Sequence, residues 1–124
     1  MDVNVDRVID TYIKAWVTQD PDLITTIFTD DAIYHERVLA EPIRGRAGIR
    51  NYWEAKVVGG QANIVVELRA VYRDSDNVIA EWDATFDDTV QCHRKHMREV
   101  AILQFAGDRI THLREYWASE RLDP

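Results

Sequence analysis

The stretch Ile27-Phe28-Thr29-Asp30-Asp31-Ala32-Ile33-Tyr34-His35-Glu36 leads from the apolar end of a helix, through two aspartates, into a short strand. Successive side chains of a strand point to opposite faces of the sheet, so Tyr34 and Glu36 share one face and His35 lies on the other. A carboxylate beside a phenol in an apolar cavity is a frequent arrangement for a general base. We therefore expect Glu36 to belong to an active site.

Two helices are expected before this strand. Apolar residues between positions 5 and 17 recur at steps of three and four, which is typical of one face of an amphipathic helix, with Asn4 as its N-cap. Asp20-Pro21 predicts a second, short helix, because aspartate caps a helix and proline is tolerated at its first position. The buried stripes of the two helices are Val5, Val8, Ile9, Tyr12, Ile13, Trp16 and Val17, and Leu23, Ile24, Ile27 and Phe28.

A third helix and a series of long strands are expected after the short strand that carries Tyr34. Irregular polarity and a proline predict a loop over 37–44, and a helix is predicted over 47–57, ended by Gly59-Gly60. The period then changes to two, which predicts strands over 63–73, 78–87, 96–106 and 109–118. Helices followed by antiparallel strands indicate an α+β fold with the helices on one side of the sheet.

Composition and charge narrow the class of protein. The 124 residues are expected to form a single domain, 1–124. A composition of 46% hydrophobic and 30% charged residues is typical of a globular chain. A net charge of −7 argues against nucleic acid and membrane partners. The single cysteine, Cys92, and an amino terminus without a basic and apolar signal segment predict a cytoplasmic protein.

Three short motifs carry a resemblance to a known family: Phe28-Thr29-Asp30-Asp31-Ala32, Gly107-Asp108-Arg109-Ile110 and Arg114-Glu115-Tyr116-Trp117. In this order and spacing, the chain resembles the nuclear transport factor 2-like superfamily in its SnoaL-like branch. The resemblance implies a cone-shaped, cystatin-like α+β barrel, in which a strongly curved, mostly antiparallel sheet wraps three helices around an apolar pocket. Ketosteroid isomerases, limonene epoxide hydrolases and polyketide cyclases belong to this superfamily.

The resemblance to the isomerases implies roles for two residues. Glu36 falls at the position of the aspartate that moves the substrate proton, and Tyr12 falls at that of the oxyanion-hole tyrosine. Ala101 stands in place of their second oxyanion-hole acid, which argues against a steroid isomerase.

The resemblance to the epoxide hydrolases is equally partial. Tyr34 matches a water-positioning tyrosine of that family, and Glu115 matches one of its catalytic aspartates. Trp82 and Ala84 replace its arginine and second aspartate. For each of the two known mechanisms, this chain therefore matches half of the catalytic residues.

Strand alternation provides the remaining candidates. The side chains expected on the pocket side are Tyr34, Glu36, Trp82, Ala84, Glu99, Ala101, Leu113, Glu115 and Trp117. The residues expected to bind a ligand are Trp16, Trp53, Trp82, Glu99, Leu113 and Trp117. Burying carboxylates among aromatic side chains costs free energy unless they are hydrogen-bonded, protonated or hydrated. This cost suggests that the carboxylates have a function. The alternative for one or more of Glu36, Glu99 and Glu115 is a solvated rim position or pairing with an arginine.

No cofactor is expected. His93 and His96 fall on opposite faces of a strand, and no further Cys or His completes a set of four ligands, so a metal site is not predicted. The glycines form neither a phosphate loop nor a dinucleotide fingerprint.

Two functions remain open. The first is a cofactor-independent isomerase, lyase or hydrolase of a small hydrophobic metabolite. In it Glu36 is the base, Tyr12 or Tyr34 donates to an oxyanion or a water, and Glu115 is an orienting or acid partner. The second is a non-catalytic module that binds a small ligand or serves in dimeric assembly, or whose pocket is filled by its own side chains.

A homodimer is also expected, because the outer face of the sheet is a common dimer contact in the family that the chain resembles. A large exposed apolar patch is unusual on a monomer. The apolar residues predicted on that face are Val65, Val71, Ile79, Val100, Ile102, Ile110 and Tyr116.

Overall fold

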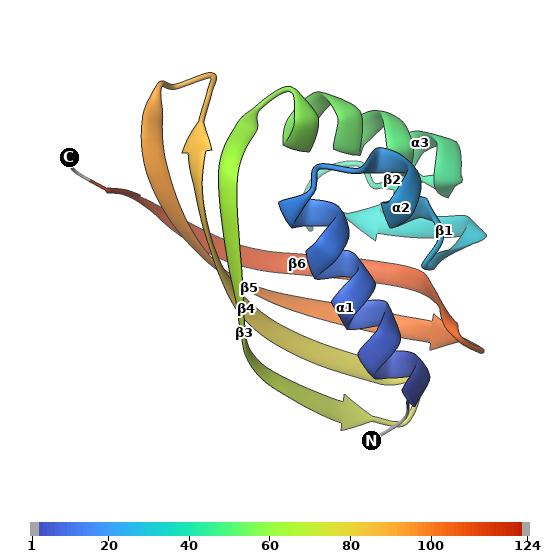
Figure 1. The fold of residues 1–124 in the computed structure, drawn as a ribbon. Helices are drawn as coiled ribbons and strands as arrows, with labels where there is room; N and C mark the ends of the chain where they lie inside the picture. The colour runs from blue at the N-terminus through green and yellow to red at the C-terminus, as the bar shows by residue number, and fades with distance from the viewer. Residues whose placement is uncertain (1–2, 123–124) are drawn as a thin grey trace.

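Three helices lie against the concave side of a curved, open sheet in the computed structural model, which describes residues 3–122 (Figure 1). The six strands have the order β2-β1-β6-β5-β4-β3, in which β1 and β6 are parallel and all other neighbours are antiparallel. The elements are α1 (Val3–Val17), α2 (Pro21–Thr25), β1 (Phe28–His35), β2 (Ile43–Arg44), α3 (Gly45–Trp53), the π-helical turn η1 (Glu54–Val58), β3 (Gln61–Asp74), β4 (Asn77–Asp88), β5 (His93–Ala106) and β6 (Arg109–Leu122).

The predicted α+β class is confirmed, and several boundaries differ from the prediction. Asn4 lies inside α1 and does not cap it. The predicted loop over 37–44 contains the short strand β2, which pairs with Ile33 and Tyr34. The third helix ends as an α-helix at Trp53 and continues as a π-helical turn, in which the Gly59 N–H donates to the Glu54 carbonyl oxygen at 3.0 Å. Single π-helical turns occur often at functional sites.

Two of the register shifts in the sheet, each a β-bulge, change which of the predicted side chains face the core. Arg69 is an extra residue between the Leu68–Trp82 and Ala70–Glu81 pairs, and Thr111 is an extra residue on β6. An extra residue shifts the alternation of the strand by one position, and every side chain beyond it changes face. Val71 therefore packs on the core and Ile110 is fully buried, so the prediction that both lie on the outer face was wrong.

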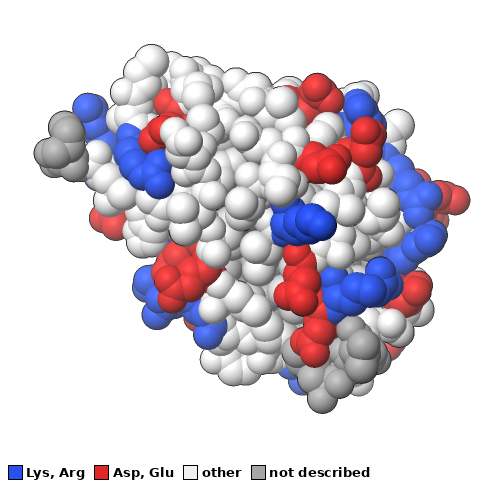
Figure 2. All heavy atoms as spheres, in the orientation of Figure 1, with Lys and Arg blue, Asp and Glu red and all other residues white. Residues whose placement is uncertain are grey.

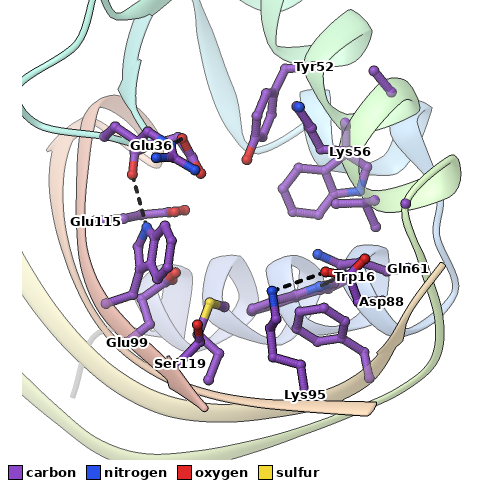
Figure 3. A pocket seen from close by; sticks show the side chains of 18 of the residues that line it. Trp16, Glu36, Tyr52, Lys56, Gln61, Asp88, Lys95, Glu99, Glu115 and Ser119 are labelled. Atoms are coloured by element: carbon purple, nitrogen blue, oxygen red, sulfur yellow. Dashed lines mark hydrogen bonds and ion pairs between the residues drawn. The ribbon is translucent and has the colours of Figure 1, made fainter. Parts of the chain in front are cut away.

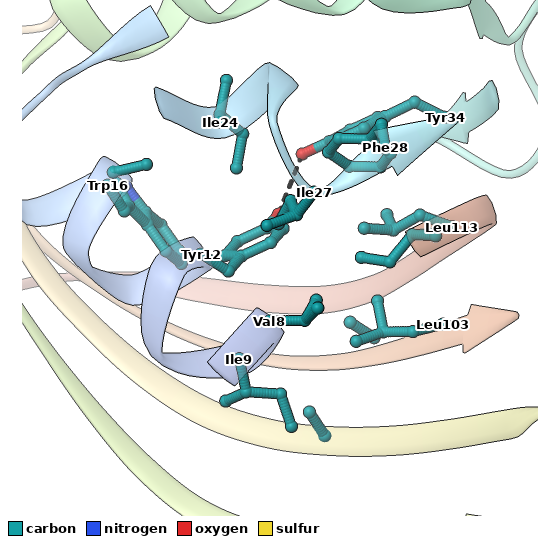
Figure 4. Packing of buried hydrophobic residues seen from close by; sticks show 14 of the residues in the cluster. Val8, Ile9, Tyr12, Trp16, Ile24, Ile27, Phe28, Tyr34, Leu103 and Leu113 are labelled. Carbon is teal, nitrogen blue, oxygen red and sulfur yellow. Dashed lines mark hydrogen bonds between the residues drawn. The ribbon is translucent and has the colours of Figure 1, made fainter. Parts of the chain in front are cut away.

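The core lies between α1 and the inner face of the sheet (Figure 4). Val8 and Tyr12, one helical turn apart on α1, are buried against the sheet, where Ala80 faces Ala101 across β4 and β5. Small alanine side chains at this level leave room for the Tyr12 ring to stack on Trp82, with ring centroids 4.9 Å apart and planes 29° apart. Burial of each large apolar side chain contributes about 1.5–3 kcal/mol.

The start of α3 is fixed to β1. Arg46 donates through Nε to the Phe28 carbonyl oxygen at 3.0 Å and through Nη1 to Asp30 at 2.8 Å. Gly45 has a φ of +73°, in the left-handed region, and a Cβ there would lie 3.4 Å from the Asp30 carbonyl oxygen. Glycine therefore suits this turn, which brings α3 over the inner face of β1.

The molecular surface carries both charge signs. On the face shown in Figure 2, acidic and basic side chains alternate over short distances without forming a continuous basic field. Within residues 3–122, no helix is long and apolar enough to span a bilayer.

The outer face of the sheet keeps an apolar strip after the two bulges are taken into account. Ile79 pairs with Ile102 and Val100 pairs with Tyr116, which is 47% exposed. Arg98 lies beside this strip and donates to Asp83 at 2.7 Å. A two-fold dimer would bury the strip and place the Arg98–Asp83 pair at its edge, and we propose that the chain pairs in this way.

We predict that Ile102→Asp shifts the protein from dimer to monomer at micromolar concentration, because a charge in the centre of an apolar contact loses its hydration on pairing. Sedimentation equilibrium checks the mass, against 14.4 kDa for one chain. The control is Leu39→Asp, at a fully exposed loop position away from the sheet. A wild-type protein that sediments as a monomer would contradict the proposal.

Candidate active site

A pocket of about 370 Å³ lies between the helices and the inner face of the sheet (Figure 3), and it is partly open to solvent. Its lining includes residues of η1, of the turn between β4 and β5, and of the second half of β6. Aromatic side chains from α1, from α3 and from the sheet line its walls. Its polar lining includes Tyr12, Tyr34, Glu99 and Glu115, which are all buried.

The strand register brings the two buried carboxyl groups together. Ala101 faces Glu115 and Trp117 faces Glu99 on the adjacent strands β5 and β6, so the two glutamates are diagonal neighbours on one face. Trp82 lies opposite Glu99 on β4, and its indole N–H donates to Glu99 Oε2 at 2.7 Å. The same inner face therefore supplies both acids and a hydrogen-bond donor for one of them.

Two tyrosines complete this cluster from outside the antiparallel strands. The Tyr12 hydroxyl, on α1, donates to Glu115 Oε1 at 2.9 Å, and the Tyr34 hydroxyl, on β1, donates to the same oxygen at 2.6 Å. The two hydroxyl oxygens are 3.0 Å apart. Glu99 and Glu115 lie close enough to share a hydrogen bond when one of them carries a proton. We call Tyr12, Tyr34, Glu99 and Glu115 the carboxyl cluster.

Burial and the mutual repulsion of the carboxylates determine where the cluster holds its protons. Burial, and then the negative charge of Glu115, raise the pKa of Glu99 well above its ordinary value, so Glu99 is the protonated member of the pair. Burial also raises the pKa of Glu115, but hydrogen bonds from Tyr34, Tyr12 and Glu99 stabilise its anion and limit the rise to about 7. The cluster thus holds a neutral acid beside a carboxyl group that titrates near neutral pH.

Glu36, the predicted base, lies on the pocket lining but outside the cluster. Its side chain is 23% exposed, and Oε2 is 3.3 Å from Nε of the neighbouring Arg37. The Arg37 guanidinium lies over the Trp117 ring, 5.5 Å from its centroid, and the Trp117 indole donates to the Glu36 carbonyl oxygen at 3.3 Å. Glu36 therefore belongs to the rim of the pocket, where its charge contributes to the raised pKa of Glu115.

The structure separates the other predicted site residues into two groups. Trp16, Trp53 and Trp117 line the pocket, as do both tyrosines of the carboxyl cluster. Trp82 and Leu113 are fully buried in the core and do not line the pocket. Trp82 supports the site from behind, through its contacts with Tyr12 and Glu99.

Several pocket residues were not identified from the sequence. They come from the ends of strands and from α3 and η1, whose directions a periodic pattern does not define, and they include Tyr52, Lys56, Gln61, Phe86, Lys95 and Met97. Only strand alternation could have indicated Phe86, which shares the inner face with Trp82. Among residues 3–122, no group of three or more His, Cys, Asp or Glu side chains could hold a metal ion.

Comparison with known proteins identifies the family to which this α+β fold belongs. Residues 9–113 match the SnoaL-like domain, and the chain belongs to this family. No curated protein matches the chain in sequence.

Solved structures share the fold at low sequence identity. A hypothetical protein from Catenulispora acidiphila with a ketosteroid isomerase-like fold, in complex with trimethylamine, has 22% identity and a TM-score of 0.78 over 88% of this chain and 83% of that one. SalBIII, an epoxide hydrolase/cyclase-like enzyme of pyran ring formation in salinomycin, has 20% identity and a TM-score of 0.78 over 91% and 89%. A putative isomerase from Bacillus subtilis has 17% identity and a TM-score of 0.82 over 93% and 86%.

The titration of Glu115 predicts how stability depends on pH. Its pKa is about 7 in the folded protein against an ordinary value of 4.5, so the folded state binds this proton more tightly than the unfolded chain. The stabilisation is complete below about pH 4.5 and is lost as the pH rises through about 7. Relative to Glu115→Gln, the wild type should lose about 3 kcal/mol of unfolding free energy between pH 4.5 and pH 8.

Urea unfolding of both proteins across this pH range measures the difference. The control is Glu41→Gln in the exposed loop after β1, which should show no such change relative to the wild type. An unfolding free-energy gap between wild type and Glu115→Gln that stays constant with pH would show that Glu115 does not bind its proton as described.

Proposed function

We propose that this protein is a general acid–base enzyme for a small, largely apolar metabolite that carries an oxygen function, with Glu115 as the base and Glu99 as the acid. One observation carries the proposal: two buried carboxyl groups lie together on the lining of an open pocket, where burial raises the pKa of both. A general base works best when its pKa is close to the working pH. Environments that push two carboxyl pKa values apart define an acid and a base.

The chemistry follows from the contacts of the cluster. As an anion, Glu115 can take a proton from a carbon next to a carbonyl group, from a hydroxyl group or from a water molecule. Tyr12 and Tyr34 hold its Oε1 in place, and Glu99 can return a proton to a developing oxygen anion. Proton transfers of this kind serve isomerisation, cyclisation and hydrolysis alike.

The pocket and the family support the same reaction classes. A volume of about 370 Å³ is at the small end of small-molecule sites, and the aromatic walls suit an apolar body. Membership in the SnoaL-like family and a fold shared with an epoxide hydrolase/cyclase-like enzyme and a putative isomerase favour isomerase, cyclase or hydrolase chemistry. Glu36 is the competing candidate base, since it also lines the pocket.

We predict that Glu115→Gln lowers kcat by about 10²–10⁴-fold on any substrate found, because the positioned base is lost. Glu36→Gln should change kcat by less than about tenfold. Substrates are sought in a panel of β,γ-unsaturated ketones, epoxides and epoxides with a tethered hydroxyl group. In the wild type, kcat should rise with pH through about 7, following ionisation of Glu115.

The matched pair of variants keeps the two candidate bases distinguishable. Both substitutions replace a carboxylate by an amide of nearly the same shape, and Glu115→Gln is assayed only where circular dichroism shows it folded. A large loss in Glu36→Gln with activity retained in Glu115→Gln would transfer the role of base to Glu36.

The second candidate function is ligand binding without chemistry. Carboxylates among aromatic rings also suit a small organic cation, which is attracted by both charge and ring faces. The structural neighbour from Catenulispora acidiphila was solved with trimethylamine, which favours this test. Calorimetric titration with trimethylamine that shows tight binding, together with no turnover across the substrate panel, would support the binding module over the enzyme.

A further inference from the structure

Tyr52 lies on the side of the pocket opposite the sheet. It is the penultimate residue of α3, one position before the buried Trp53. Its half-buried side chain lines the pocket. Figure 3 shows its hydroxyl directed into the cavity, on the side of Glu36 and Glu115. Its ring packs against Tyr34, with centroids 5.5 Å apart.

Several hydrogen-bond donors around the pocket are already engaged. The hydroxyl groups of Tyr12 and Tyr34 both donate to Glu115, and the proton of Glu99 can be shared with Glu115. These groups stabilise the carboxylate, and a substrate oxygen could recruit them only by breaking those bonds.

Two nitrogen donors of the walls are engaged in the same way. The Trp16 indole donates to Gln61 Oε1 at 2.8 Å, and Lys95 Nζ pairs with Asp88 at 3.0 Å. The Trp53 indole nitrogen has no partner, but it is buried without accessible surface.

Tyr52 differs from these groups. Within residues 3–122 its hydroxyl makes no hydrogen bond, and it is not one of the buried unpartnered atoms, so it is open to the pocket. Lys56 also makes no ion pair with a described residue, but it is exposed to solvent. A phenol hydroxyl that faces a cavity without a protein partner is available to a ligand.

We propose that Tyr52 is a catalytic residue whose hydroxyl donates a hydrogen bond to the carbonyl or ether oxygen of the bound substrate. This inference rests on the proposed function, since it assigns the group that polarises the substrate while Glu115 removes the proton. It also specifies the ligand class: a neutral molecule with an oxygen acceptor that can reach Tyr52 while its reacting proton reaches Glu115.

The electrostatic surroundings suit such a donor. Burial, and then the charges of Glu115, Glu36 and Glu99, raise the pKa of Tyr52, whereas Arg37 lowers it. The hydroxyl therefore keeps its proton through the pH range in which Glu115 ionises. Negative charge that develops on a substrate oxygen beside Tyr52 would strengthen the hydrogen bond, which is the condition for lowering a barrier.

The test uses 2-acetonaphthone labelled with ¹³C at its carbonyl group, an apolar ketone that accepts hydrogen bonds but donates none. Infrared difference spectra give its C=O stretching frequency when bound, and fluorescence titration gives its Kd. We expect a shift to lower frequency in the wild type that disappears in Tyr52→Phe, with Kd weakened about five- to tenfold. The matched control is Tyr72→Phe, at an exposed position on the outer face of the sheet.

The measurement also separates this inference from the proposed function, because it needs no turnover. Glu115→Gln should keep the infrared shift while it loses proton transfer, and Tyr52→Phe should lose the shift. A shift that persists in Tyr52→Phe, a wild type that shows no shift, or a wild type that does not bind the ketone would each overturn the assignment of Tyr52.

Discussion

Two carboxyl groups can be buried side by side only if they share a proton and their remaining oxygens find donors, because two adjacent anions in a low-dielectric interior repel strongly. Glu99 and Glu115 are diagonal neighbours on the inner face of the sheet and are subject to this constraint. Their donors come from three separate elements: Tyr12 on α1, Tyr34 on β1 and Trp82 on β4. The position of α1 and the parallel pairing of β1 with β6 are therefore tied to the same cluster of protons.

The constraint also explains the division of labour among the aromatic residues. Trp82 is fully buried and stacks with Tyr12 behind the cluster, so it orients both an acid and a donor without reaching the pocket. Trp117 is partly exposed and links the rim to β6 through the Glu36 carbonyl group and the Arg37 guanidinium. One tryptophan thus stabilises the interior end of the site, and the other organises its opening.

Three helical patterns followed by four period-two stretches were sufficient to predict the α+β class, since each pattern, such as that of β4 or the capped start of α2, depends on local chemistry. The structure agrees at Trp82 and Ala84, and at Asp20, whose side chain accepts hydrogen bonds from two backbone N–H groups of α2. The bulges at Arg69 and Thr111 were not predictable, because an extra residue depends on cross-strand pairing. They reversed the predicted orientation of Val71 and Ile110.

Only part of the candidate site was predicted, because strand alternation depends on local sequence alone. Alternation indicates which face a side chain occupies, and it correctly grouped Tyr34, Glu99 and Glu115, but it does not indicate depth along the pocket. Glu36 stood out in the sequence because it follows the strand that carries Tyr34, yet that position just beyond the end of β1 is also why it reaches the rim. Tyr52 could not be assigned because a helix with buried Ile49 and Trp53 has two flanks, and only its packing on β1 decides which flank meets the pocket.

The pocket is open because the strands of the sheet are longer than the helix α3 that covers them. β5 and β6 have 14 residues each and β4 has 12, whereas α3 has nine and passes into a five-residue π-helical turn. The strands therefore extend beyond the helices that cover them, and Phe86, Met97 and Ser119 face the pocket there. A closed core would need a longer helix over this end of the sheet. Without it, the inner face that buries the carboxyl cluster at one level continues as the accessible wall of a binding site at the next.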